Sequence, residues 1–452
     1  MAYLDRTMQA HAGTGRIALS ELFGAFSYAL DLTEGQPAGH CIRVCLIGSR
    51  IGRLIGLSEA ELWDLYYVLL LKDLGCSSNA ARVCQLYLGN DRELKRDFKL
   101  VGTGIRDALG FVVSRTGRDA SIRQRAGAIL NILRNGGSIM HELVQTRCTR
   151  GADIARRLHF AEPVAQGIYA LDEHWDGSGA PDGLAGEAIP LFARIALLAQ
   201  VADVFHHNAG AEAALAEVER RGGSWFDPAL VAAFRTLAAD ESFWRDLASP
   251  SIEATVLALE PARRTIAADE DFLDDVAAAF GEVVDAKSPF TGGHSSRVAD
   301  LAMLVADRLG FPAERLRWLR RGALLHDIGK LGVSNTILDK PGPLDEPEWV
   351  HMRRHAADTQ AILERISAFH DLAPMAAAHH EKLDGTGYPL RLDADAIPLA
   401  TRIITTADIF DALTADRPYR AALPTARALE IMRAQVGRAI DPQCFEALEA
   451  VA

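Results

Sequence analysis

The sequence predicts an all-α protein, and two observations carry this prediction. Apolar residues recur every three or four positions in segments such as 300–309 and 398–413, which is the period of a helix that buries one face. Runs that alternate apolar and polar residues, as half-buried strands do, are scarce along the chain. Glycine pairs at 136–137, 222–223 and 292–293 separate the helical segments. We therefore expect helices joined by glycine-containing loops and no substantial sheet.

The size and charge of the chain limit the classes of protein to which it can belong. Its 452 residues exceed one ordinary domain, and 49% apolar with 24% charged residues is a globular composition. The net charge of −12 disfavours binding to bulk nucleic acid, whose phosphates are also negative. Six cysteines without a C-x-x-C pair argue against a zinc ribbon or a disulfide scaffold.

The sequence offers no segment suited to export or to a membrane. Residues 1–20 contain charged side chains and lack the apolar core of a signal peptide. The longest apolar stretches, 62–71 and 189–205, are interrupted by polar residues and fall short of the roughly 20 residues that a membrane helix needs. We expect a cytoplasmic protein without a membrane partner.

An internal repeat divides the chain into two halves. The segment His40–Val44 (HCIRV) resembles His294–Val298 (HSSRV), and Lys72–Gly75 (KDLG) resembles His326–Gly329 (HDIG). Both matches have an offset of 254 positions. Because coincidence explains two equal offsets poorly, we expect two related helical domains.

A third match at a different offset indicates an insertion in the first copy. Residues 175–181 (WDGSGAP) resemble 383–389 (LDGTGYP) at an offset of 208 positions. The smaller offset means that the first copy carries about 46 extra residues, which we place within 85–135. The expected organisation is a first domain at 1–248, a connector at 249–267 and a second domain at 268–452.

Histidines and acidic residues concentrate in the second half. His326 and Asp327 are adjacent at the end of an apolar helical segment, and Asp408 lies within another apolar helix, where a carboxylate needs a strong partner. Imidazole and carboxylate ligands suit Fe, Mn, Ni or Zn, and a bridging carboxylate can hold two such ions about 3.5–4 Å apart. A His-Asp pair alone is weak evidence, because a core histidine beside a capping Asp is commoner. The other histidines of this region are His294, His351, His355, His370, His379 and His380.

Two longer motifs of the second half resemble a known family. The run His326–Lys330 (HDIGK), followed by His379–Pro389 (HHEKLDGTGYP), is similar to the HD-GYP family of bacterial phosphodiesterases. These proteins are all-α HD phosphohydrolases that hydrolyse cyclic di-GMP. The similarity extends from about Asp285 to Asp441. It implies a metal-dependent cyclic di-GMP phosphodiesterase built of tandem HD-like helical bundles.

The resemblance also implies a centre with two metal ions. The cofactors would be two divalent transition-metal ions, Fe or Mn first, with Ni or Zn as alternatives. His351 and His370 fall outside the family pattern, and we expect them on the surface. The implied metal ligands are His294, His326, Asp327, His355, His379, His380 and Asp408.

The same resemblance assigns residues to a cyclic dinucleotide substrate. Lys330 matches a phosphate-contacting lysine of the family, and the fork of an arginine side chain suits phosphate. Asp411 follows Asp408 by three positions on the same helical face, where it would orient a ligand or the attacking water. The implied catalytic residues are Asp327, Lys330 and Asp411. The implied substrate-binding residues are Arg297, Lys330, Gly387, Tyr388, Pro389, Arg417 and Arg420.

The expected reaction is an in-line attack on one phosphorus by a hydroxide that bridges the two ions. Some relatives have a glutamate four residues before the first histidine ligand, where it helps to hold a third ion. Phe290 occupies that position here, so we expect two ions and a linear dinucleotide as the main product. Two alternatives stay open: hydrolysis of another cyclic dinucleotide or nucleotide, and a catalytically silent receptor that binds nucleotide and signals.

The first half lacks most of these ligands. His40 and Asp73 match His294 and Asp327. The positions of His326, His355, His379, His380 and Asp408 are taken by Lys72, Arg147, Leu171, Asp172 and Gln200, respectively. We expect no metal there, and ion pairs of the two cations with the carboxylates instead. This half would serve as a scaffold or as the surface of a homodimer, with a sensory or regulatory role as the alternative.

Overall fold

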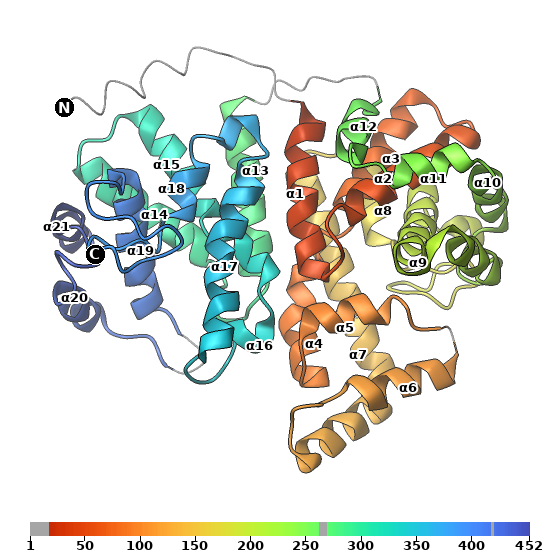
Figure 1. The fold of residues 1–452 in the computed structure, drawn as a ribbon, viewed down its shortest axis with the longest axis horizontal. Helices are drawn as coiled ribbons and strands as arrows, with labels where there is room; N and C mark the ends of the chain where they lie inside the picture. Colours follow the sequence, from red (N-terminus) through yellow and green to blue (C-terminus); the bar gives the residue numbers. More distant parts are fainter. Residues whose placement is uncertain (1–17, 103, 262–268, 417–419) are drawn as a thin grey trace.

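The computed structural model describes residues 18–102, 104–261, 269–416 and 420–452. In these ranges every regular secondary-structure element is a helix, and β pairing is limited to three isolated bridges. This confirms the all-α prediction. The helices form two groups that lie side by side (Figure 1). The first group contains α1 (Leu19–Glu34), α2 (His40–Leu54), α3 (Glu59–Leu71), η1 (Cys76–Asn79), α4 (Ala80–Tyr87), α5 (Asp91–Phe98), α6 (Ile105–Arg115), α7 (Ile122–Arg157), α8 (Glu162–Tyr169), η2 (Gly186–Ala188), α9 (Leu191–Arg220), α10 (Pro228–Ala238), α11 (Glu241–Leu247) and α12 (Ile252–Ala258). The second group contains α13 (Glu270–Asp285), α14 (His294–Arg308), α15 (Ala313–Leu325), η3 (Ile328–Gly332), α16 (Asn335–Leu338), α17 (Glu346–Leu363), η4 (Ser367–Phe369), α18 (Ala373–Ala377), α19 (Leu399–Thr414), α20 (Thr425–Arg433) and α21 (Pro442–Glu449).

The two groups repeat one helical order. In the first half the order α1, α2, α3, η1, α7, α8, α9 corresponds to α13, α14, α15, η3, α17, α18, α19 in the second. The first half has extra helices between η1 and the part of α7 that corresponds to α17. We call residues 80–137 the insert; it comprises α4, α5, α6 and the N-terminal part of α7. It forms the lower end of the first half in Figure 1.

The two halves share one hydrophobic core, which is continuous from α1 to α13. Phe26 of α1 stacks on Phe280 of α13 with ring centroids 3.6 Å apart and planes at 11°, and both side chains are fully buried. These residues are equivalent under the offset of 254 positions. The neighbouring contacts are reciprocal too, since α1 touches η3 and α17 while α13 touches η1 and α7. The copies therefore face each other as in a pseudo-two-fold dimer within one chain.

Helix α5 of the insert also binds the second half directly. Asp91, which is fully buried, accepts hydrogen bonds from Ser334 Oγ and from the Asn335 backbone N–H, both at 2.8 Å. Arg92 donates to the carbonyl oxygens of Leu32 and Gly332 at 2.7 and 2.6 Å. The insert is thereby held against the loop that follows η3.

The expected connector is partly helical. Its helix α12 packs against the first half, where the Tyr66 hydroxyl donates to the Val256 carbonyl at 3.1 Å and the Tyr67 hydroxyl to Glu260 at 2.5 Å. Residues 262–268 lie outside the described part of the chain. The boundaries at 248 and 268 stay a prediction.

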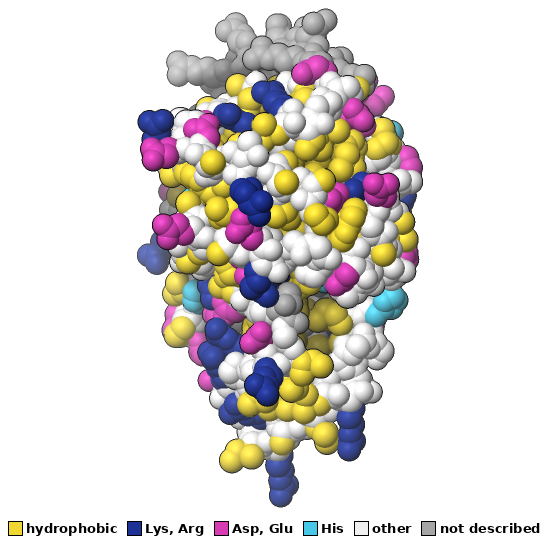
Figure 2. Space-filling view, turned by 90° about the vertical axis from the view of Figure 1, so that its right-hand side faces the viewer, with side chains coloured by type: hydrophobic (Ala, Val, Ile, Leu, Met, Phe, Trp, Pro, Cys, Tyr) yellow, Lys and Arg dark blue, Asp and Glu magenta, His cyan; other side chains and the backbone are white. Residues whose placement is uncertain are grey.

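The outer face of the first half is mixed in character. Figure 2 shows Lys and Arg side chains gathering toward the end that the insert forms, with apolar atoms between them. Ile105 and Ile122 are 81% and 88% exposed there. No helix in the described ranges has both the length and the apolar character to cross a bilayer. Exposed arginines of this region are Arg96, Arg106, Arg118, Arg123 and Arg134.

Candidate metal centre

Five helices bring the predicted ligands of the second half together. His294 is the first residue of α14, and His326 and Asp327 end α15 where η3 begins. His355 lies on α17, the pair His379 and His380 follows α18, and Asp408 lies on α19. The close packing of α14 on α15 and α19, and of η3 on α17, places these positions around one centre.

The outer nitrogen of each buried histidine is held by a hydrogen-bond acceptor. Nδ1 lies 2.7 Å from the Ala323 carbonyl in His326, 2.6 Å from the Met352 carbonyl in His355 and 2.7 Å from the Ala376 carbonyl in His379. Because a carbonyl can only accept, each of these Nδ1 atoms carries the proton and each Nε2 presents a lone pair. Histidine ligands of metals are oriented in this way.

The Nε2 atoms of four histidines converge on the two oxygens of Asp327. Nε2 of His294 and of His326 lie 3.5 and 3.3 Å from Oδ2, whereas Nε2 of His355 and of His379 lie 3.6 and 3.5 Å from Oδ1. All four Nε2 atoms and Oδ1 are buried without a hydrogen-bond partner among the described residues. Buried polar atoms are normally satisfied, so this cluster indicates an ion or ions.

Two groups of donor atoms share Asp327, and a third group joins His326, His379 and Asp408. One group is His294, His326 and Asp327; the other is Asp327, His355, His379 and His380, and within each group the donor atoms lie within 4.8 Å of one another. Asp408 Oδ1 lies 3.4 Å from His294 Nε2, beside the first group. Two ions bridged by one carboxylate fit this arrangement, and the seven predicted ligands are those that the fold assembles.

The protonation states suit metal binding. Burial lowers the pKa of His355 to about 3 and that of His380 well below its usual value, so both rings are neutral at pH 7. Burial opposes ionisation of Asp327, but Lys330 and His326 hold the pKa of this carboxyl well below its usual value. His294 differs: burial lowers its pKa, but the carboxylates of Asp327, Asp411 and Asp408 raise it to about 9, so this ring would have to lose a proton to ligate an ion.

Asp411 and Arg297 position His294 and do not face the ligand centre. Asp411 Oδ2 lies 2.7 Å from His294 Nδ1, and its oxygens accept from Arg297 Nε and Nη2 at 2.6 and 3.1 Å. Arg297 also donates to the Gly292 carbonyl at 2.7 Å. Of the two roles predicted for Asp411, its contact with His294 favours orienting a ligand over orienting the attacking water. Arg297, predicted to bind substrate, donates to Asp411 in this structure, and its role in substrate binding stays a prediction.

We expect Asp411→Ala to lower metal affinity and kcat by roughly 10–100-fold, the usual cost of removing a group that orients a metal ligand. Metal titration and steady-state kinetics of the full chain would measure this, with KM unchanged. Asp203→Ala is the matched control, because Asp203 makes the same 2.7 Å contact to His40 Nδ1 in the first half. Equal losses in both variants would contradict the positioning role.

The turn at Gly387–Pro389 lies against the ligand centre. The Tyr388 ring packs on the His380 ring with centroids 4.8 Å apart. A Cβ on Gly387 would lie 2.5 Å from the Glu381 Cα, so only glycine permits this close approach. The Glu381 carboxylate accepts backbone N–H bonds from the three residues that follow the turn, at 2.6 to 3.0 Å.

Several supporting residues were not predicted from the sequence. Besides Glu381, Thr359 donates to the His326 carbonyl at 3.0 Å and accepts from the Gly329 N–H at 3.0 Å. Thr405 donates to the His379 carbonyl at 2.7 Å. Glu381 could have been predicted, because it directly follows the two histidines in the sequence. Nothing in the sequence marks the two threonines as supporting residues.

The predicted phosphate-binding residues are placed differently from one another. Lys330 is ion-paired with Asp327 at the centre. Arg420 donates to the carbonyls of Ala412 and Leu413 at 2.7 and 2.9 Å, at the C-terminal end of α19. Arg417 lies outside the described residues.

The residues expected to lie away from the ions do so. His351 and His370 are exposed. Asp285, the acidic residue nearest to Phe290 in sequence, accepts from the Ser295 hydroxyl at 2.7 Å and is thus occupied at the start of α14. Neither Phe290 nor Asp285 belongs to a group of metal-ligating atoms among the described residues.

The first half contains the expected ion pairs at the equivalent positions. Lys72 pairs with Asp73, and Arg147 pairs with Asp172 through Nε at 2.8 Å. Lys72 and Asp73 are both buried. Asp203 contacts His40 as Asp411 contacts His294, at an offset of 208 positions. The same offset places Gln200 at the position of Asp408, which supports the alignment of the two halves without a gap in this helix. The absence of metal from this half stays a prediction.

Comparisons with known proteins cover both halves. The family profile described as HD domain matches residues 114–230 and 279–444. The 3'3'-cGAMP-specific phosphodiesterase 3 of Vibrio cholerae serotype O1 is 55% identical over 431 residues, which are 95% of this chain and 94% of that protein. The cyclic di-GMP phosphodiesterase response regulator RpfG of Xanthomonas campestris pv. campestris is 41% identical over 160 residues, 35% of this chain and 42% of that protein.

A solved structure is similar over nearly the whole length. The crystal structure of a cyclic GMP-AMP specific phosphodiesterase of V. cholerae, V-cGAP3, superimposes with a TM-score of 0.65 at 50% identity. The alignment covers 96% of this chain and 97% of that one. The similarity thus includes the first half as well as the ligand cluster.

Proposed function

Because the chain belongs to the HD domain family, we propose that it is a metal-dependent phosphodiesterase of cyclic dinucleotides with 3'3'-cyclic GMP-AMP as its preferred substrate. The observation that carries the chemistry is the convergence of four unpartnered Nε2 atoms on the two oxygens of Asp327. The complete ligand set favours an enzyme over a silent nucleotide receptor.

Different residues of the second half would hold the ions and bind the phosphates of the substrate. When bound, the two ions would supply a Lewis acid for the phosphate oxygens and a water acidic enough to attack at neutral pH. Asp327 would hold both ions in register, and the carbonyl-anchored histidines would fix their positions. The ammonium of Lys330 is close enough to the centre to contact a phosphate oxygen. Arg417 and Arg420 stay candidates for the second phosphate.

The choice of substrate follows from how far each similarity extends. RpfG, named for cyclic di-GMP, aligns with 35% of this chain. The relative named for 3'3'-cGAMP aligns with 95%, including the first half and the insert. The family resemblance of the motifs implies cyclic di-GMP, but the motif residues do not read the base. We therefore place the mixed dinucleotide first and cyclic di-GMP second.

Initial-rate kinetics of the metal-loaded full chain on three cyclic dinucleotides tests this proposal. We expect kcat/KM for 3'3'-cyclic GMP-AMP to exceed that for cyclic di-GMP and cyclic di-AMP by about tenfold or more, because a site that hydrogen-bonds one base leaves polar groups unpaired with the other. Equal values would contradict the preference. If the protein with two ions bound turned over none of the three, the proposal that it is an enzyme would be contradicted.

We expect the linear dinucleotide to accumulate as the main product. A second cut must accept an additional terminal phosphate charge, and Phe290 stands where some relatives hold a third ion. Asp285 cannot substitute while Ser295 occupies it. Chromatography of a time course would show the linear species rising to most of the product before mononucleotide forms. Mononucleotide appearing as fast as the cyclic substrate disappears would contradict this expectation.

The proposal also covers the identity of the metal, a cytoplasmic location and a homodimeric assembly. A histidine-rich site with carboxylates suits Fe or Mn, with Ni or Zn as alternatives, and elemental analysis of the purified protein would distinguish them. Six free cysteines are consistent with a reducing cytoplasm. The exposed Ile105 and Ile122 of the insert support a homodimer through the first half, which mass measurement in solution would show.

A further inference from the structure

The first half contains a cavity of about 310 Å³ that the proposed function does not use. Its lining includes Arg147, Asp172 and Gln200, which occupy the positions of three metal ligands of the second half. The insert and the following part of α7 line the cavity with an apolar wall. Leu94, Phe98 and Phe111 belong to the insert, and Met140, Leu143 and Val144 belong to α7 beyond it.

The cavity carries an excess of one positive charge. Glu34 is flanked by two ammonium groups, Lys95 at 3.2 Å and Lys99 at 3.0 Å. Burial opposes ionisation of Glu34, but Lys99 and Lys95 hold the pKa of its carboxyl below the usual value, so one carboxylate faces two cations. Arg147 and Asp172 balance each other.

The remaining charged groups of the lining do not reverse this excess. Glu217 Oε1 lies 2.6 Å from both Arg220 and Arg221, so Arg221 shares its carboxylate with a second arginine. Burial lowers the pKa of His174 to about 4, so this ring is neutral at pH 7. The net charge that faces the cavity is therefore at least that of one unbalanced ammonium.

Two buried amides in the lining lack partners. Gln200 is 6% exposed and Asn79 is 7% exposed, and Gln200 Oε1 and Asn79 Oδ1 have no hydrogen-bond partner among the described residues. Since an amide oxygen only accepts, each of them needs a hydrogen-bond donor, which an N–H or O–H group of a ligand or a bound water would supply.

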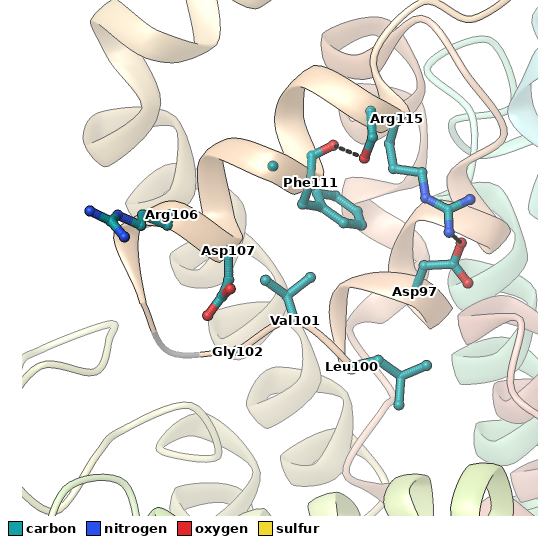
Figure 3. A pocket seen from close by; sticks show the side chains of 10 residues that line it. Asp97, Leu100, Val101, Gly102, Arg106, Asp107, Phe111 and Arg115 are labelled. Atoms are coloured by element: carbon teal, nitrogen blue, oxygen red, sulfur yellow. Dashed lines mark hydrogen bonds and ion pairs between the residues drawn. The ribbon is translucent and has the colours of Figure 1, made fainter.

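A second, shallow pocket lies on the outer side of the insert and shares Phe111 with the cavity (Figure 3). There Arg115 is paired with Asp97 at 2.8 Å, and Arg106 points away from the other labelled side chains. This outer pocket has none of the unpartnered buried amides found in the cavity, so it carries no comparable case for a ligand.

We propose that the cavity binds a small organic monoanion with an apolar body, such as an aromatic or alkyl carboxylic acid. Its acidic group would lie near Lys95 and Lys99, its body against Phe98, Phe111 and Leu143. The volume of about 310 Å³ falls within the range of small-molecule sites. The apolar walls disfavour a dianionic mononucleotide.

The probe for this proposal is anilinonaphthalene sulfonate, an aromatic monoanion whose fluorescence rises in apolar surroundings. With the metal-loaded full chain we expect one saturable site, from which decanoate displaces the probe. The neutral phenylnaphthylamine has the same aromatic body without the sulfonate. It should bind about tenfold more weakly or worse, because it lacks the charge-assisted contacts.

Variants separate this cavity from other apolar surfaces. Lys99→Met should weaken binding of the sulfonate about tenfold without changing that of the neutral probe. Val144→Trp should fill the cavity and abolish both. Arg134→Met, which removes an exposed cation of the same helix as Val144, should change neither. Circular dichroism and phosphodiesterase turnover near wild-type values would show that each variant is folded.

Two results would overturn the proposal. One is sulfonate binding that survives both Lys99→Met and Val144→Trp in folded protein. The other is a neutral probe that binds as tightly as the sulfonate to the wild-type chain. Neither result depends on which cyclic dinucleotide the second half hydrolyses.

Discussion

Replacing Asp327 with asparagine should abolish turnover of cyclic dinucleotides by the full-length protein. Asparagine keeps the shape of the side chain but loses the charge and one of the two oxygens that face separate histidine groups. Bound metal contributes several kcal/mol to such a reaction, and each 1.36 kcal/mol is tenfold in rate, so we expect a loss of about 10³-fold or more. Elemental analysis should show fewer than two ions per chain.

The internal repeat supplies the control for this experiment. Asp73 is the equivalent of Asp327 in the first half and is buried to the same degree. Asp73→Asn should leave metal content and kcat near wild-type values, although it lowers stability because Lys72 loses its buried partner. Near-normal activity of Asp327→Asn with both ions bound would refute the assigned centre.

Phe26→Ala should lower the free energy of unfolding of the whole chain by about 3–5 kcal/mol, the usual cost of truncating a buried phenylalanine. Phe26 is fully buried and stacked on Phe280. The void left by the missing ring would therefore lie between the two halves and not within one of them. Chemical denaturation followed by circular dichroism would measure the change. Ile122→Ala, at a side chain that is 88% exposed, should change the free energy by less than about 0.5 kcal/mol.

The number of transitions is a second readout of the same variant. Because one core continues from α1 to α13, we expect a single transition in wild type and in Phe26→Ala. Two well-separated transitions in the wild-type chain, with Phe26→Ala affecting only one of them, would show that the halves fold independently.

The sequence predicted which side chains lie together because much of the signal is in short motifs. His326 and Asp327 are adjacent, His379 and His380 are adjacent, and the glycine-containing turn follows within ten positions. The resemblance of these motifs to a family, and not the His-Asp pair alone, supplied His294, His355 and Asp408, and binding of metal by all seven residues stays a prediction. The helical class was equally accessible, since a period of three to four residues is visible locally.

The contacts that could not be predicted join residues far apart in the chain. The orientation of Arg297 toward Asp411 spans 114 positions, and the contact of Lys287 with Asp91 spans 196. A helical period shows that Asp411 shares a face with Asp408, but not that its oxygens would be filled by His294 and Arg297. The sequence likewise indicated an insertion of about 46 residues, but not the cavity that the insert helps to line.

The pairing of α1 with α13 also bears on how a duplicated gene can change. Each helix completes the buried surface of the other copy, so neither copy can be deleted without exposing the apolar face of its twin. The ligand positions are under no such constraint, because Lys72 and Arg147 can replace histidines once they balance Asp73 and Asp172. A copy that lost its metal ligands would therefore be retained as a folding partner while its chemistry diverged. Selection on the first half should act more strongly on residues such as Phe26 than on the positions that correspond to the ligand cluster of the second half.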